Sequence, residues 1–257
     1  MPRPEIALTA PAGPAGAPVV VLAHSLGTGP LIWERVVPVL AVRYRVSLLT
    51  LPGHGEAPVP GAPFTMAELA DAVARAAPVA SGLRYAGVSI GGALGLELAL
   101  RHPELVAAVA SVASAASLGT PDLWRERARF VRERSTSALV TESAARWFAP
   151  ASIGRDPAMV GRVLHALQDT SDEGYARCAE ALATYDVRAR LGELRTPVLA
   201  MGGCLDEVAP EERQDELVAG VPGARKLMIE AAAHQPPAEQ PAAVAAALRA
   251  FFEEVAP

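Results

Sequence analysis

The sequence predicts an α/β fold, in which a mostly parallel sheet is wrapped on both faces by helices and carries an inserted block of helices. Two observations lead to this prediction. Short apolar runs alternate with helical periodicity in the first and last parts of the chain. Between these parts, residues 121–190 contain helical segments and no convincing strand. We therefore expect a sheet core formed by residues 1–118 and 191–257, with residues 119–190 as a helical cap.

The first part of the chain alternates strands with helices. Apolar runs bounded by Gly, Pro and polar residues mark the strands. Thr65 is a good N-cap for one helix, and Glu68 follows three residues later as the partner in a capping box. The expected strands are residues 6–9, 18–23, 45–49, 83–86 and 106–112, and the expected helices are residues 31–42, 66–77 and 93–100.

The cap and the last part of the chain follow the same rules. Helical periodicity dominates the cap, and strand and helix patterns then resume. The expected cap helices are residues 123–134, 138–147, 158–167 and 175–182. The expected later elements are a strand at residues 197–201, a helix opening at Pro210, a strand at residues 225–229 and a last helix at residues 241–254.

Composition limits the possible function classes. The 257 residues are 51% hydrophobic, yet no apolar run approaches the roughly 18 residues needed to span a bilayer. The first residues do not form a secretion signal, so we expect a cytoplasmic protein without a membrane partner. A net charge of −5 argues against a nucleic-acid partner. Cys178 and Cys204 lie far apart without metal-ligand spacing, so we expect reduced thiols and no metal site.

The expected cap differs from the core in charge. Residues 121–190 hold 11 Arg against 10 Asp plus Glu, which gives them a net charge of +1. Since the whole chain carries −5, the remaining residues carry about −6. A cap of this kind offers mild attraction to anions.

Residues 87–92, Gly-Val-Ser-Ile-Gly-Gly, fit the pattern G-x-S-x-G between a predicted strand and a predicted helix. This pattern is typical of a nucleophile elbow, a tight turn that exposes its serine. Strand and helix approach closely there, so Gly87 and Gly91 have a steric reason to be glycine. Ser89 is therefore the candidate nucleophile, although the same pattern also fits a Gly-rich turn with an idle serine.

A serine hydroxyl needs a base and a group that orients the base. His234 lies in a loop after the last predicted strand, at the sheet edge where ligands of parallel sheets bind. Asp206 follows the strand at residues 197–201, with Glu207 as its rival for the orienting role. The chain order Ser89, Asp206, His234 is that of a known hydrolase arrangement.

The other histidines receive structural interpretations. His24 and His54 lie in strand-end loops, where we favour structural hydrogen bonding. His102 is placed at a helix end and His165 on a cap helix.

For an oxyanion hole we expect the backbone N–H of Ile90, together with a donor from the loop after residues 18–23.

Leu26 is our choice for that second oxyanion donor, because it lies in the loop that follows the strand at residues 18–23. An N–H donor makes little demand on its side chain, so this assignment rests on position.

Over nearly its full length the chain resembles the α/β-hydrolase superfamily, and within it the 3-oxoadipate enol-lactonases. The motifs that carry the resemblance are His24-Ser25-Leu26-Gly27-Thr28 with Trp33, Gly53-His54-Gly55, Gly87-Val88-Ser89-Ile90-Gly91-Gly92, Arg146-Trp147-Phe148-Ala149-Pro150, Tyr185-Asp186-Val187-Arg188, Asp206, and His234 with Glu239-Gln240-Pro241. The chain departs from the family pattern at Thr50-Leu51-Pro52, and at Gln235-Pro236-Pro237 after the histidine.

The resemblance implies a serine hydrolase that opens a small carboxylate-bearing lactone, 3-oxoadipate enol-lactone, without a cofactor. It also implies that Arg146 binds the substrate carboxylate, with Trp147 lining the pocket beside it. A bidentate guanidinium suits that task. Alternatives are a general carboxylesterase, a C–C bond hydrolase, and a ligand-binding relative with little turnover.

Overall fold

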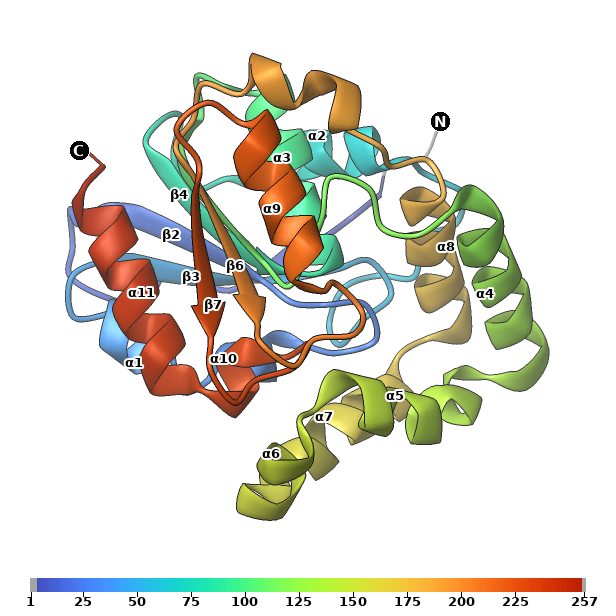
Figure 1. The fold of residues 1–257 in the computed structure, drawn as a ribbon. Helices are drawn as coiled ribbons and strands as arrows, with labels where there is room; N and C mark the ends of the chain where they lie inside the picture. Colours follow the sequence, from blue (N-terminus) through green and yellow to red (C-terminus); the bar gives the residue numbers. More distant parts are fainter. Residues whose placement is uncertain (1–3, 256–257) are drawn as a thin grey trace.

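The protein contains one seven-stranded sheet with the strand order β1-β3-β2-β4-β5-β6-β7 (Figure 1). The computed structural model describes residues 4–255. Strand β1 pairs antiparallel with β3, and the other neighbouring strands are parallel. The predicted fold class is therefore confirmed. The strands are β1 (Ala7–Leu8), β2 (Val19–Ala23), β3 (Arg45–Thr50), β4 (Leu83–Val88), β5 (Val106–Val112), β6 (Val198–Gly203) and β7 (Arg225–Ile229).

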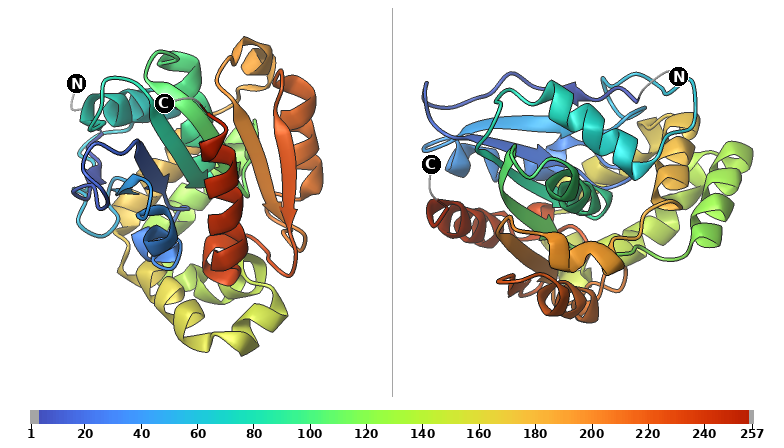
Figure 2. Two further views of the ribbon diagram at one scale, coloured as in Figure 1. Left: turned by 90° about the vertical axis from the view of Figure 1, so that its left-hand side faces the viewer. Right: turned by 90° about the horizontal axis from the view of Figure 1, so that it is seen from above.

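Both faces of the sheet are covered, which explains why its central strands read as continuous apolar runs. Every residue of β2, β4 and β6 is buried. One core cluster joins the sheet to α2 (Met66–Ala76), α3 (Ile90–Arg101) and α9 (Glu211–Gly220). A second joins the other face to α1 (Val37–Leu40) and α11 (Pro241–Glu253), and the two further views show the sheet between these layers (Figure 2).

Five α-helices lie between β5 and β6 along the chain, and this described segment contains no strand. In Figure 1 they extend beside and below the sheet, on the side toward which β6 and β7 point. The helices are α4 (Pro121–Arg134), α5 (Val140–Trp147), α6 (Pro150–Arg155), α7 (Pro157–Asp169) and α8 (Asp172–Leu182). The division of the chain into a core and a cap at residues 119 and 190 stays a prediction, and the 3-10 helix η3 (Arg188–Glu193) runs across its second boundary.

The prediction of a single helix at residues 31–42 is wrong. The structure has a 3-10 helix, η1 (Pro30–Trp33), followed by the four-residue α1. Pro38 has no backbone N–H to donate to a residue one turn earlier, so a continuous helix loses a hydrogen bond in its middle. The β-branched Val36, Val37 and Val39 further weaken helix formation there.

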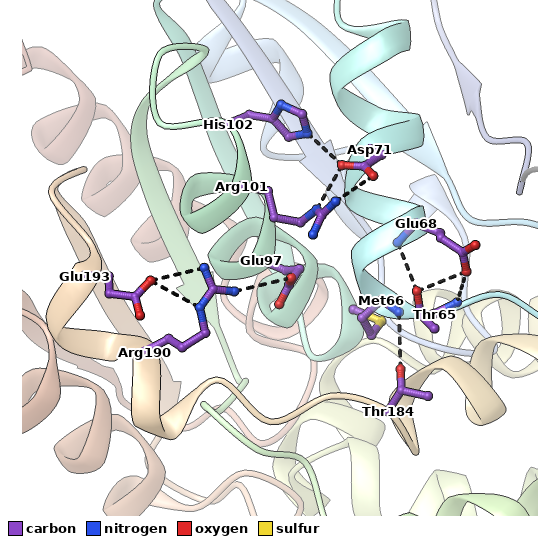
Figure 3. A network of polar contacts seen from close by, with 10 residues as sticks. All are labelled: Thr65, Met66, Glu68, Asp71, Glu97, Arg101, His102, Thr184, Arg190 and Glu193. Atoms are coloured by element: carbon purple, nitrogen blue, oxygen red, sulfur yellow. Dashed lines mark hydrogen bonds and ion pairs between the residues drawn. The ribbon is translucent and has the colours of Figure 1, made fainter.

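Polar contacts tie α2 to α3, and Glu97 of α3 to Arg190 of η3 (Figure 3). The capping box is present as predicted, since the Thr65 side chain accepts from Glu68 N–H while the Glu68 carboxylate accepts from Thr65 N–H. His102 is the C-cap of α3, and both it and Arg101 bind Asp71 at 2.8 Å. These contacts fix the far end of the helix whose first residue follows Ser89.

No helix among residues 4–255 is long and apolar enough to cross a membrane. Both cysteines are free thiols, and Cys178 is buried while Cys204 is exposed.

Candidate active site

Ser89 lies on a strained turn between β4 and α3. Its φ of 55° and ψ of −117° are unusual for a residue with a side chain. A Cβ at Gly87 would lie 2.3 Å from the carbonyl atoms of Gly91, and a Cβ at Gly91 would lie 2.8 Å from the backbone oxygen of His24. Glycine is therefore required at both positions, as the motif predicts. Strain maintained by this much surrounding structure is a mark of functional sites.

The turn directs Ser89 into a cavity of about 210 Å³ that His234 also lines. The cavity lies where strand order reverses around β2 and β4, the usual ligand position in a parallel sheet. Ser89 is partly exposed, and its Oγ makes no hydrogen bond to the residues that the structure describes. Its backbone is held on both sides, because its N–H donates to Val112 at 2.8 Å and its carbonyl accepts from the Ser114 hydroxyl at 2.7 Å.

His234 and Asp206 form a buried pair beside this cavity. His234 Nδ1 lies 2.9 Å from Asp206 Oδ2. Burial of Asp206 opposes its ionisation, but the charge of His234 and hydrogen bonds from His234, Ala209 and Val208 outweigh it and hold the pKa of this carboxyl below its usual value. An ionised carboxylate can only accept, so Nδ1 carries a proton, and in the neutral form of the imidazole Nε2 is then the acceptor. Glu207, the rival for the orienting role, makes no hydrogen bond or ion pair with His234 among the described residues.

The loop after β2 brings Leu26 to the cavity wall. Among residues 4–255, neither the N–H of Leu26 nor that of Ile90 has a protein acceptor. Gly27, with φ of +75°, bends the chain directly after Leu26.

His24 and His54 hold that loop through hydrogen bonds to the backbone, as their structural interpretation predicts. His54 Nε2 accepts from Gly27 N–H at 3.0 Å, and His24 Nε2 accepts from Leu51 N–H at 3.1 Å. Their Nδ1 atoms donate to backbone carbonyls. Burial lowers the pKa of His54 to about 4. Burial and the neighbouring His54 ring together lower the pKa of His24 to about 3. Both rings are therefore neutral at neutral pH.

Arg146 and Trp147, the two predicted substrate-binding residues, both line the cavity. Two further charged residues line the cavity with Arg146. Arg127 of α4 and Glu142 of α5 lie beside it, and Glu142 Oε1 accepts from Arg127 at 3.0 Å and from Arg146 at 3.1 Å. The Arg127 side chain is 21% exposed against 44% for Arg146. Arg127 and Glu142 were not predicted from the sequence, because they are 15 residues apart and meet only where α4 lies near α5.

A second hollow of about 380 Å³ lies between α6, α7 and the start of α11. Although it is larger, neither Ser89 nor His234 lines it. The smaller cavity is the candidate active site, because the strained Ser89, Leu26 and His234, which Asp206 binds, lie together there. In the part of the chain that the structure describes, no group of three or more His, Cys, Asp or Glu residues is arranged to hold a metal ion.

The chain belongs to the α/β-hydrolase fold family, whose model matches residues 18–241. It is 34% identical over 201 residues to 3-oxoadipate enol-lactonase 2 of Acinetobacter baylyi, covering 76% of this chain and 74% of that protein. It is 31% identical to a pimeloyl-[acyl-carrier protein] methyl ester esterase of Aeromonas hydrophila, covering 85% and 89%. The crystal structure of the enol-lactonase from Burkholderia xenovorans LB400 matches with a TM-score of 0.92 at 29% identity, covering 97% of both chains. The predicted family resemblance is confirmed, and similarity to these relatives supports a hydrolase role for this chain.

Proposed function

We propose that the protein is a serine hydrolase acting on a small ester or lactone through Ser89, His234 and Asp206. The observation that carries the proposal is the buried His234-Asp206 pair beside a strained serine in one cavity. Ser89 Oγ attacks the carbonyl carbon while His234 Nε2 takes its proton, and Asp206 holds the imidazole in the required tautomer. Catalytic hydrogen bonds are often long or poorly aligned before substrate binds, so the unbonded Ser89 Oγ agrees with this role.

The N–H groups of Leu26 and Ile90 stabilise the oxyanion of the tetrahedral intermediate. His234 then gives its proton to the leaving oxygen, which breaks the ester bond and leaves an acyl group on Ser89. A water activated by His234 releases the acid and restores the serine. The proposed cycle uses no cofactor.

We propose a substrate that carries one free carboxylate, with 3-oxoadipate enol-lactone as the favoured compound. Two guanidinium groups and one carboxylate at the cavity wall leave one positive charge, which a monocarboxylate balances. Similarity to the enol-lactonases supports the same choice. Arg127 is less exposed than Arg146, so we assign it the stronger share of carboxylate binding.

The test compares Arg127→Ala and Arg146→Ala on the enol-lactone and on neutral p-nitrophenyl acetate. We expect kcat/KM for the lactone to fall about 30-fold for Arg127→Ala, equivalent to about 2 kcal/mol. We expect about fivefold, or about 1 kcal/mol, for the more exposed Arg146→Ala. Hydrolysis of the neutral ester should change little in both. Arg129→Ala is the matched control, since Arg129 lies on the same helix and does not line the cavity.

Equal losses on both substrates would mean that Arg127 and Arg146 only hold the cap together. A general carboxylesterase is the second candidate, supported by similarity to the methyl ester esterase. It predicts good turnover of neutral short esters and little preference for the lactone. A ligand-binding relative predicts no burst of p-nitrophenol and no turnover, and a C–C bond hydrolase predicts no turnover of either substrate class.

A further inference from the structure

Glu239 is a buried acidic residue next to the candidate active site that the proposed chemistry does not use. It ends the short helix α10 (Pro236–Glu239), which follows the His234 loop, and it is 6% exposed. In Figure 1, α10 lies at the edge of the sheet that faces the cap helices. A buried carboxylate without a cation needs several hydrogen bonds to offset its desolvation.

Those hydrogen bonds come from the backbone on both sides of His234. Glu239 Oε1 accepts from Ala233 N–H at 2.8 Å and from Gln235 N–H at 3.2 Å. These two residues flank His234 directly. One carboxylate oxygen therefore binds the N–H groups of the residues before and after the proposed base.

The other oxygen binds the segment that leads out of α5. Glu239 Oε2 accepts from Ala149 N–H at 2.8 Å. Two residues earlier, the carbonyl of Trp147 accepts from the N–H of His234 itself at 3.1 Å. Trp147 lines the cavity, so the wall of the cavity and the proposed base are held in one hydrogen-bonded unit with Glu239 at its centre.

We propose that Glu239 is a positioning residue that holds His234 in register with both Ser89 and the Trp147 segment of the cavity wall. The inference rests on the proposed role of His234 as the base. Asp206 fixes the imidazole ring through Nδ1, whereas Glu239 fixes the backbone that carries the ring. A displacement of about 1 Å in a catalytic group can lower a rate about 100-fold, so a rigid backbone at this point is a catalytic requirement.

The charge and the shape of the carboxylate both matter. Three backbone N–H groups and the Ser152 side chain converge on two oxygens, and a carboxylate is the side chain that presents two acceptors and no donor. In Glu239→Gln, the amide NH₂ replaces one of the oxygens and faces a backbone N–H. The variant keeps the volume of the side chain and loses at least one of the three hydrogen bonds.

The test measures Glu239→Gln beside the control Glu97→Gln. Glu97 is also a buried glutamate, 7% exposed, but it lies on α3 near Arg190, away from the cavity (Figure 3). We expect kcat for p-nitrophenyl acetate to fall about 10- to 100-fold in Glu239→Gln with little change in KM. Glu97→Gln should retain the wild-type kcat, and thermal unfolding identifies any loss of folded protein in either variant.

Burst kinetics separate positioning from a merely structural role. A misplaced base slows acylation in every molecule, so the burst should keep its full amplitude and lose rate. A smaller burst at the wild-type rate would mean that part of the protein is unfolded, and it would overturn the inference. A burst with the wild-type rate and amplitude would also overturn the inference.

Hydrogen exchange provides a readout that does not depend on activity. In Glu239→Gln, the amides of Ala149, Ala233 and Gln235 should exchange faster, with no such change in Glu97→Gln. Unchanged protection at these amides would contradict the inference. Ser89→Ala and His234→Ala serve as reference variants. If both keep their turnover, the proposed function is wrong; if both lose it while Glu239→Gln matches the wild type, only the positioning role is wrong.

Discussion

Ser89, His234 and Asp206 illustrate how residues distant in the sequence depend on one another. In the proposed mechanism they act as a unit, so Ser89→Ala and His234→Ala should each lower kcat for an ester substrate by about 10⁴- to 10⁶-fold. Asp206→Asn should be milder, since the remaining carbonyl oxygen can still accept from Val208 and Ala209 N–H or from His234. Steady-state hydrolysis of p-nitrophenyl acetate measures all three.

Stability should barely change in Ser89→Ala, because Ser89 Oγ makes no hydrogen bond to the described residues. Thermal unfolding checks this. If Ser89→Ala keeps more than about a tenth of the wild-type turnover, covalent catalysis by Ser89 is wrong.

Individual residues were predictable where a local motif constrains them. Ser89 stands in a glycine pattern that only a tight strand-to-helix turn requires, and His234 and Asp206 each follow a recognisable strand. Arg127 and Glu142 have no such local signature, and the motif Glu239-Gln240-Pro241 does not indicate what Glu239 binds. Their roles depend on contacts made by helix packing and by a loop folding back on itself, and a single sequence does not specify these.

At the scale of elements, β5 and β7 have the predicted bounds, while α6, α10 and η3 were not predicted. Buried strands carry a strong apolar signal, and helices of four to six residues do not show enough periodicity to be recognised.

The departure from the family pattern at Gln235 joins two loops of the site. Its buried amide bonds with Ser25 Oγ at 2.9 Å, which joins the His234 loop to the loop that holds Leu26.

Helix α2 provides a test of the predicted capping box. Thr65→Ala removes the acceptor for Glu68 N–H and should lower the free energy of unfolding by about 1 kcal/mol. Urea unfolding of the two proteins measures this difference. Thr65→Ser keeps the hydroxyl and should stay close to the wild type. A Thr65→Ala variant as stable as the wild type would mean that tertiary packing alone sets the start of α2.

In the whole molecule, the strand ends of the sheet carry the residues of the proposed chemistry, and the helices between β5 and β6 form part of the cavity wall. Ser89, Asp206 and His234 all follow strands of the sheet, whereas Arg127 and Arg146 lie on α4 and α5. Variation in these helices can therefore change the substrate while the strand-end residues are retained. This arrangement agrees with similarity to both enol-lactonases and methyl ester esterases.

Global stability should decrease in mild acid because two histidines are buried in neutral form. His24 and His54 have folded pKa values of about 3 and about 4, while an unfolded histidine has a pKa of about 6.5. Below pH 6.5 the unfolded chain binds protons that the folded chain does not bind, so stability falls as pH decreases. Each histidine contributes up to about 1.4 kcal/mol per pH unit, until the pH reaches its folded pKa.

The measurement is the free energy of urea unfolding between pH 7 and pH 4.5, a range that lies above both folded pKa values. His54→Gln should be less stable than the wild type at pH 7, because glutamine does not reproduce both the bond to Gly27 N–H and the bond to the Pro52 carbonyl. Its stability should nevertheless fall less steeply toward acid, since one of the two buried titrating groups is gone. His165→Gln is the control, because His165 is exposed on α7 and should leave the slope unchanged. Equal slopes in His54→Gln and the wild type would mean that His54 is protonated in the folded protein, and the neutral acceptor assigned to its Nε2 would be wrong.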